Sequence, residues 1–158
     1  MPYSHEIRVS WGDCDPARIA YTARIPAWAL EAINGWWEHH FGGGWFQMEM
    51  DHNFGTPFVH MSLDFRHPIT PRHRLICAVA PTRLGDTSVA WRVIGRQDGA
   101  VCFEGSFVCV FTIADQFRKA PPPRPCAPWC SSIWNPRQNS AIARAFRRMP
   151  IVRRQGIP

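Results

Sequence analysis

The middle of the chain is dominated by segments in which apolar and polar residues alternate, at about 55–67, 73–84, 87–97 and 100–113. A period of two residues indicates strands that bury one face. Gly85 and Asp86 supply a turn between the second and third segments, and Asp98 and Gly99 supply one between the third and fourth. The sequence therefore predicts a long antiparallel β-sheet joined mainly by tight turns.

One segment before this meander has the periodicity of a helix. Apolar residues recur at intervals of three and four from about Ala27 to Phe41, Pro26 is placed to occupy the first turn, and the glycines at 42–44 end the pattern. The preceding segment 5–11 alternates like a half-buried strand, with Trp11 on its apolar face. We therefore expect an α+β domain in which an antiparallel sheet packs against a single helix.

The chain has 158 residues, which suits one domain of ordinary size. With 46% hydrophobic and 19% charged residues, it is globular rather than disordered. Six prolines fall between 121 and 136 and exclude regular structure there. We expect a folded domain at 1–120, followed by a proline-rich segment and a basic tail at 121–158, with a short helix at 140–149.

The formal net charge is +6, but much of the excess is contributed by arginines between 137 and 154. Binding of nucleic acid through this tail is suggested by charge alone, with no recognition motif, so nucleic acid is not an expected partner. The chain has neither a long apolar run nor the apolar core of a secretory signal, so we expect a cytoplasmic protein that does not bind membranes.

The six cysteines are expected to be free thiols, because the chain has no export signal and is not small. Cys126 and Cys130 have a spacing found in some zinc sites, but no second pair accompanies them, so no metal is predicted. His39 and His40 are expected to interact with the negative end of the helix dipole rather than with a metal.

The segment WGDCDP at 11–16 places two carboxylates on either side of a thiol. Asp15 is a candidate catalyst because a carboxylate can attack a carbonyl or deprotonate water, although an aspartate before proline commonly only shapes a turn. Asp13 is expected to hold the loop by accepting backbone amides. Cys14 is a rival nucleophile if a base approaches it, but a buried structural thiol is the commoner role.

Three motifs resemble the 4-hydroxybenzoyl-CoA thioesterase family of hotdog-fold proteins. WGDCDPARIAYTARIPAWALEA at 11–32 is similar to the family's aromatic-Gly-Asp-x-Asp-Pro-Ala-Gly-Ile-Val-aromatic signature and the helix that follows it. FGTPFV at 54–59 resembles the opening of its second strand, and TRLGDTSVAW at 82–91 resembles its strand-turn-strand segment. The resemblance implies a curved antiparallel sheet wrapped around one long central helix, in homodimers or homotetramers whose active sites are shared between protomers.

The resemblance also implies roles for individual residues. Asp15 corresponds to the aspartate that acts on the thioester carbonyl, as nucleophile or as base for water. A backbone amide at the start of the helix, near Thr22, is expected to polarise that carbonyl. Trp45 stands at the spacing of the tryptophan that lines an aromatic acyl pocket. Three further residues are expected to contribute to the substrate site: Arg18, Tyr21 and His60, although a sheet surface or a dimer contact explains His60 equally well.

Two departures from the family pattern concern charged residues. Arg18 replaces the glycine that follows Pro-Ala, and it is placed to keep Asp15 ionised by lowering the pKa of that carboxyl. The arginines that the family places near the strand-turn-strand segment for the nucleotide phosphates have no clear counterpart at Gly85 and Asp86. The residues that contact CoA are therefore left open.

These features together favour an acyl-CoA thioesterase that hydrolyses an aromatic or medium-length acyl-CoA to the free acid and CoA. CoA would enter only as part of the substrate, and no separate cofactor is expected. The sequence is also compatible with two alternatives: a non-catalytic hotdog protein that binds acyl thioesters, and a thioesterase that acts on acyl carrier protein.

Overall fold

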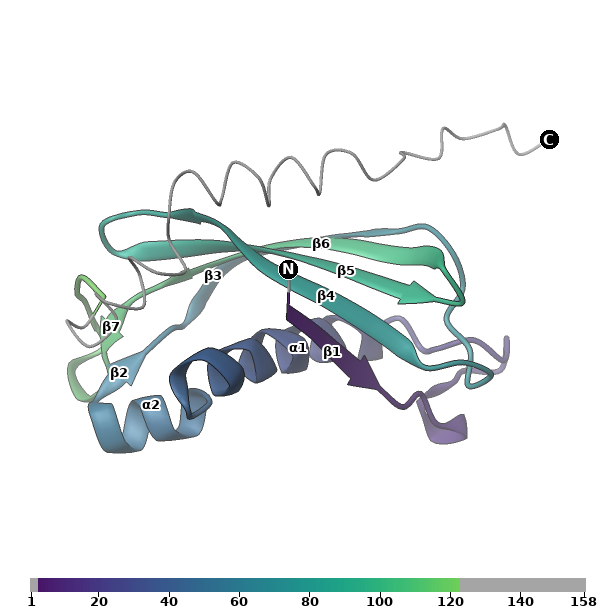
Figure 1. Cartoon of the computed structure of the whole chain (residues 1–158), viewed down its shortest axis with the longest axis horizontal. Helices are drawn as coiled ribbons and strands as arrows, with labels where there is room; N and C mark the ends of the chain where they lie inside the picture. The colour runs from purple at the N-terminus through teal and green to yellow at the C-terminus, as the bar shows by residue number, and fades with distance from the viewer. Residues whose placement is uncertain (1–2, 123–158) are drawn as a thin grey trace. The chain divides into compact units, whose positions relative to one another are not determined.

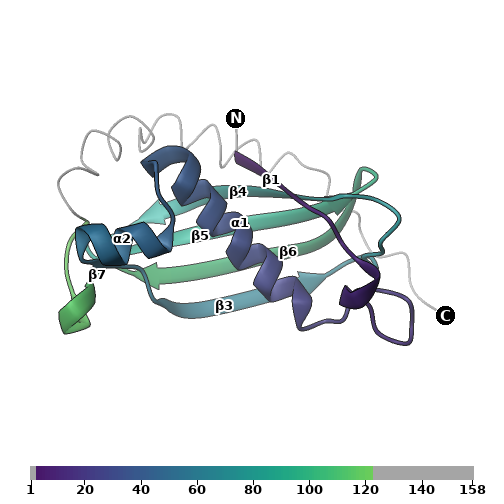
Figure 2. The same ribbon diagram turned by 90° about the horizontal axis from the view of Figure 1, so that it is seen from below.

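The computed structural model describes residues 3–122. One long helix, α1 (Arg24–Phe41), lies along the concave side of a curved antiparallel sheet (Figures 1 and 2). The sheet has five strands in the order β1-β4-β5-β6-β3. Their bounds are β1 (Tyr3–Ile7), β3 (Phe58–Phe65), β4 (Leu75–Leu84), β5 (Ser88–Gln97) and β6 (Ala100–Val110). The expected α+β hotdog fold is confirmed.

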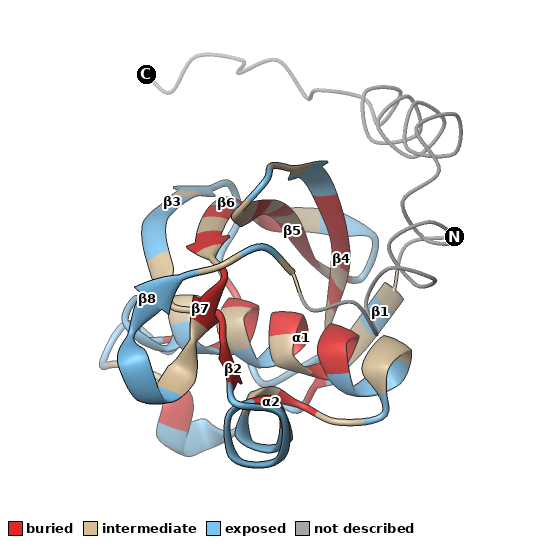
Figure 3. Ribbon diagram, turned by 90° about the vertical axis from the view of Figure 1, so that its left-hand side faces the viewer, coloured by how far each residue is buried: buried red, intermediate tan, exposed pale blue. Residues whose placement is uncertain are grey.

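The core lies between α1 and the face of the sheet that the helix covers (Figure 3). Trp91 of β5 stands directly opposite Phe107 of β6, and both are almost fully buried. The ring centroids of Trp36 and Trp37 on α1 lie 4.6 and 5.4 Å from that of Trp91. Burial of these large rings fixes the helix on the sheet, because each removes a large apolar area from water.

The helix begins at Arg24, three residues earlier than predicted, and Pro26 lies in its first turn as expected. It ends at Gly42, which has a φ of 77° in the left-handed region and donates its amide to the Glu38 carbonyl at 3.0 Å. Glycine adopts this conformation without the strain that a Cβ would cause. The predicted end of the helix is therefore confirmed.

Both predicted turns of the meander are also confirmed. Between β5 and β6, Asp98 and Gly99 have φ values of 47° and 79°, and two successive positive φ angles are typical of a type I′ hairpin. Between β4 and β5, the Gly85 amide donates to the Ser88 carbonyl at 2.8 Å.

The first strand is shorter than predicted, because it ends at Ile7. Val9 is still buried, but Trp11 lies in a 3-10 turn (Trp11–Asp13) and is 74% exposed. The predicted burial of Trp11 is therefore wrong. Trp11 is exposed because the Asp13 carboxylate accepts hydrogen bonds from the amide and hydroxyl of Ser10. These bonds turn the chain at Trp11, so the alternating strand pattern does not continue to that residue.

The sequence did not predict a second helix, α2 (Trp45–His52), or a small sheet in the order β2-β7-β8. Among the residues of α2 only Met48 is buried, so the helix has no apolar stripe to reveal it. The single strand predicted at 100–113 is therefore two strands in the structure, β6 in the large sheet and β7 in the small one. The strands of the small sheet are β2 (Phe54–Gly55), β7 (Thr112–Ile113) and β8 (Arg118–Lys119), and a 3-10 turn (Ala114–Gln116) precedes β8.

Several predictions lie outside the described residues: the proline-rich segment beyond 122, the helix at 140–149 and the pair Cys126 and Cys130. The domain boundary near 120 stays a prediction. Within the described part of the chain, no helix is both long and apolar enough to cross a membrane. The four cysteines there are free thiols, as expected: Cys14, Cys77, Cys102 and Cys109.

The packing of the sheet gives a test at Gly95. A Cβ there would lie 2.1 Å from Cε1 of the buried Phe103 ring, so we expect Gly95→Ala to lower the free energy of unfolding by about 1–3 kcal/mol. Gly12→Ala is the matched control, because the nearest atom to its Cβ is the Ser10 hydroxyl at 3.9 Å. Urea unfolding measures both, and equal stabilities would contradict the packing described here.

Candidate active site

Residues 13–21 form a narrow loop between β1 and α1, and backbone contacts close it across its width. Cys14 pairs with Ala20 in an isolated antiparallel bridge. The Asp15 amide donates to the Ile19 carbonyl at 3.0 Å. Such bonds remove much of the conformational freedom of the loop, so the side chains at its tip are held in defined positions.

Asp13 connects this loop to both neighbouring elements. Its carboxylate accepts hydrogen bonds from the Ser10 amide (2.8 Å) and hydroxyl (2.6 Å), and from Nε of Arg24 on α1 (2.8 Å). Its carbonyl accepts the Tyr21 amide at 2.8 Å. The bonds from Ser10, followed by those from Arg24, lower the pKa of the Asp13 carboxyl to about 2. The predicted role of Asp13 in holding the loop is confirmed.

Asp15 lies half-buried near the tip of the loop. Its Oδ1 accepts the Ala17 amide at 2.8 Å, and its carbonyl accepts the Arg18 amide at 2.9 Å. These are the contacts of an aspartate that shapes a turn. Its Oδ2 makes no hydrogen bond with any residue at 3–122, and it is therefore the oxygen available for chemistry.

Arg18 adopts a φ of 64°, in the left-handed region that favours glycine. The loop thus keeps a backbone conformation that the glycine of the family signature would take without strain. The Arg18 guanidinium is exposed and forms no ion pair with Asp15 or any other carboxylate of the described chain, so the expected pairing of Arg18 with Asp15 is wrong. Tyr21 closes the loop and is 56% exposed.

The start of α1 presents backbone amides near the loop. The amides of Arg24 and Ile25 already donate to the carbonyls of Tyr21 (2.8 Å) and Thr22 (3.2 Å). The amides of Thr22 and Ala23 make no hydrogen bond within residues 3–122. Because the positive end of the helix dipole is here, these two N–H groups are suited to binding an oxygen that becomes negative.

Cys14 lacks the surroundings of a nucleophilic thiol. Its Sγ donates weakly to the Ser10 carbonyl at 3.6 Å, and no histidine of the described chain hydrogen-bonds to it. A nucleophilic thiol is activated by a neighbouring base or cation, and Cys14 has no such contact with the described residues. The geometry therefore favours the packing role that the sequence suggested for Cys14.

The histidines predicted near the end of α1 are His39 and His40, and both lie in its last turn. Nδ1 of His40 lies 2.9 Å from the Trp36 carbonyl, and burial lowers the pKa of the His40 imidazole. No group of three or more metal-ligating side chains comes together among residues 3–122.

Trp45 begins α2, beyond the C-terminal end of α1. Its amide donates to Oδ1 of Asn34 at 2.8 Å, and its ring meets Phe58 of β3 edge-on, with centroids 5.6 Å apart. Its indole Nε1 is buried and has no hydrogen-bond partner within the described chain, and the same is true of the Thr56 hydroxyl oxygen. Buried polar groups without a hydrogen-bond partner are uncommon in proteins, because each loses its bonds to water without replacement.

Asp15 and Trp45 do not meet within one chain. The 18 residues of α1 separate the loop from α2 by about 27 Å of helix, and Figures 1 and 2 show the two at opposite ends. His60 is exposed on β3 opposite Val108, so it points to the face of the sheet away from Phe107 and α1. A single chain therefore brings together Asp15, Arg18, Tyr21 and Thr22, but neither Trp45 nor His60.

Sequence reasoning missed two residues that build the loop, Ser10 and Arg24. The Ser10-x-x-Asp13 spacing is that of a capping box, which was an available signal. The contact from Arg24 depends on where the helix begins, which the sequence left uncertain by three residues.

The chain matches the model of the thioesterase-like superfamily over residues 9–130, which is most of its length. It therefore belongs to the thioesterase-like superfamily, and it is an enzyme of the thioester hydrolase class. The narrower assignment to the 4-hydroxybenzoyl-CoA type stays a prediction. None of the curated proteins compared with the chain matches it.

Solved structures resemble the chain closely. A thioesterase superfamily protein from Jannaschia sp. CCS1 is 56% identical, with 77% of this chain and 85% of that chain covered and a TM-score of 0.76. A 1,4-dihydroxy-2-naphthoyl-CoA thioesterase from Synechocystis is 21% identical, with 85% and 97% covered and a TM-score of 0.74. A gentisyl-coenzyme A thioesterase is also 21% identical, with 77% and 96% covered and a TM-score of 0.69. The last two share the fold.

The contacts of Asp13 predict a pH-dependent contribution to stability. Because its pKa falls from 3.8 to about 2 on folding, the contribution is complete above pH 4 and is lost as the pH falls from about 4 to about 2. We expect Asp13→Asn to lower the free energy of unfolding at pH 7 by about 2 kcal/mol. The difference from wild type should shrink across that acidic window in urea unfolding.

Asp51→Asn is the control for this prediction, because Asp51 is exposed and makes no side-chain hydrogen bond within residues 3–122. If the effect of Asp13→Asn is the same at pH 7 and pH 2, the carboxylate does not hold the loop through its charge.

Proposed function

We propose that the protein hydrolyses an acyl-CoA thioester to a free acid and CoA, and that Asp15 performs the reaction. One observation carries the proposal: Oδ2 of Asp15 and the amides of Thr22 and Ala23, which have no hydrogen-bond partner in the described part of the chain, lie at the same end of α1. The first supplies an attacking group or a base, and the amides supply an oxyanion site.

In this proposal the thioester carbonyl oxygen accepts a hydrogen bond from the Thr22 amide. Oδ2 of Asp15 either attacks the carbonyl carbon or takes a proton from a water that attacks it. In both routes the carbon–sulfur bond breaks and CoA leaves as a thiolate that takes up a proton. In the general-base route water supplies the new oxygen of the acid directly, whereas in the covalent route a second step is needed, in which water hydrolyses the acyl-Asp15 anhydride and restores the Asp15 carboxylate. Asp13 would keep the geometry by linking the loop to Arg24.

The acyl group is proposed to be aromatic and to carry a polar substituent. Trp45 and Phe58 offer ring surfaces, while the indole N–H of Trp45 and the hydroxyl of Thr56 are buried polar groups that have no hydrogen-bond partner among residues 3–122. A hydroxyl on an aromatic ring would satisfy such groups, whereas an aliphatic chain would not. The two named CoA thioesterases of similar fold act on dihydroxylated aromatic acyl groups, which agrees with this choice.

A second copy of the chain is proposed to complete the site. β3 is an edge strand of eight residues with three exposed apolar side chains, Val59, Met61 and Phe65. An open apolar edge of this kind favours pairing with another strand. Antiparallel pairing of two β3 strands reverses the second copy, so its α2 end comes beside the Asp15 end of the first. Association into tetramers stays an implication of the family resemblance.

We expect Asp15→Asn to lower kcat by about 10²-fold or more with the fold intact, because the amide neither attacks nor accepts a proton. Thiol release is measured with hydroxybenzoyl-CoA, other hydroxyaryl acyl-CoAs and aliphatic acyl-CoAs. A single turnover in H₂¹⁸O tests the covalent route: ¹⁸O in the Asp15 carboxylate shows that an acyl-Asp15 anhydride formed and was opened by water at the Asp15 carbonyl carbon, whereas general-base attack never labels Asp15.

Cys14→Ala is the matched control, since it changes the neighbouring side chain of the same loop. It should keep wild-type activity. Full activity of Asp15→Asn together with loss of activity in Cys14→Ala would transfer the catalytic role to the thiol and overturn this proposal.

A further inference from the structure

The loop between β3 and β4, residues 66–74, is rich in basic side chains. All of its arginines and histidines are exposed: Arg66, His67, Arg72, His73 and Arg74. A surface with this density of cationic groups attracts anions, and guanidinium groups bind phosphate through paired hydrogen bonds.

The positive charge of this loop is mostly not neutralised by the chain itself. Nε of Arg74 lies 3.5 Å from Oε1 of Glu6, an exposed ion pair. Arg66 and Arg72 have no carboxylate oxygen within 4.0 Å among the described residues. All twelve acidic residues of the sequence lie between Glu6 and Asp115, within the described residues. None of their carboxylates therefore pairs with Arg66 or Arg72.

The backbone of the loop is held firmly although its cationic side chains are exposed. Gln97 is 7% exposed, and its Nε2 donates to the carbonyls of Thr70 and His73 at 2.8 Å each. Its Oε1 accepts the Thr70 amide at 3.0 Å, and the Cys102 carbonyl accepts the Arg66 amide at 2.7 Å. A loop fixed in this way binds a ligand with a smaller entropic cost.

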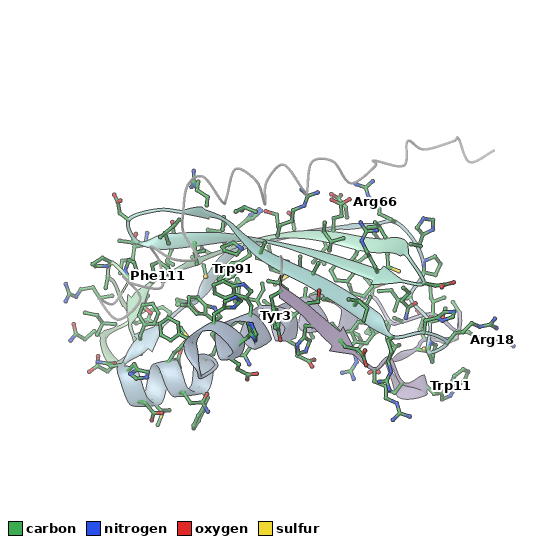
Figure 4. All side chains as sticks on the ribbon, viewed as in Figure 1. Tyr3, Trp11, Arg18, Arg66, Trp91 and Phe111 are labelled. Atoms are coloured by element: carbon green, nitrogen blue, oxygen red, sulfur yellow. The ribbon has the colours of Figure 1, made fainter. Side chains whose placement is uncertain are left out.

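The same loop lies against the loop that carries Asp15. The Ala20 amide donates to the carbonyl of the buried Ile69 at 2.7 Å. Figure 4 shows Arg66 above the sheet, in the same half of the molecule as Arg18. Arg18 adds another exposed cation without a carboxylate partner among the described residues.

We propose that residues 66–74, together with Arg18, bind the phosphate groups of the CoA nucleotide while the thioester lies at Asp15. This inference rests on the proposed function. In an acyl-CoA the pantetheine arm separates the thioester from the phosphates, so the anion site must lie beside the catalytic loop and outside it. The 66–74 loop meets that requirement. It also supplies the charge that the sequence lacks at Gly85 and Asp86.

The test is calorimetric binding of CoA and of pantetheine, which lacks the nucleotide and its phosphates. The double variant Arg66→Gln, Arg72→Gln should bind CoA at least about tenfold more weakly and bind pantetheine as wild type does. The control Arg118→Gln, Lys119→Gln removes the same charge from exposed β8 and should leave both affinities unchanged. Equal thermal unfolding temperatures show that both variants fold.

Kinetics provide the second measurement. The double variant should have a raised KM for acyl-CoA, a kcat within about twofold of wild type, and unchanged kinetics with the matching acyl-pantetheine. Wild-type CoA affinity in the double variant, an equal loss for pantetheine, or a loss confined to acyl carrier protein substrates would each overturn the phosphate site. Failure of wild-type protein to cleave any thioester would instead defeat the proposed function, while CoA binding would still test the loop.

Discussion

The Asp13 carboxylate is the contact on which the arrangement of this end of the molecule depends. It binds Ser10 at the end of the first strand and Arg24 at the start of α1, and its backbone carbonyl binds the Tyr21 amide. A buried carboxylate is stable only when donors surround it, so the three segments are fixed together. Asp15 gains its position from this arrangement, because a carboxylate in an unrestrained loop would have no defined relation to the amides at the helix start.

The long helix divides the chemistry of the chain between two ends. Asp15, the amides of Thr22 and Ala23, and the basic 66–74 loop lie at the N-terminal end of α1, and the aromatic surface around Trp45 lies at the other end, about 27 Å of helix away. Pairing of a second copy along the open edge of β3 would bring the Trp45 end of one protomer beside the Asp15 end of the other. In this account the acyl group, the thioester and the phosphates each contact a different element, so substrate selection and catalysis can be altered separately.

Most of the sheet was predictable because the alternation of a strand and the Asp98-Gly99 turn are local properties of the sequence. Trp11 and α2 were not, because they depend on tertiary contacts: the Asp13 carboxylate turns the chain at Trp11, and Asn34 caps the first amide of α2. At the site, the family signature predicted Asp15 as the catalyst, and that role stays a prediction. The spacing of thirty residues between Asp15 and Trp45 did not reveal how far apart the two lie in space, because the length of α1 sets that distance. The sequence did not single out the basic 66–74 loop, because the contact that places it against the Asp15 loop is a tertiary one.

The central claim is that one active site combines Asp15 of one protomer with Trp45 of another. It is tested most directly by co-refolding two variants, Asp15→Asn and Trp45→Ala, each with little activity alone. Random assembly makes about half of the dimers hybrid, and each hybrid contains one intact Asp15 and Trp45 pair in a single site. A site shared between protomers predicts about a quarter of wild-type thiol release from the mixture. Activity no higher than the mean of the two separate variants would contradict it.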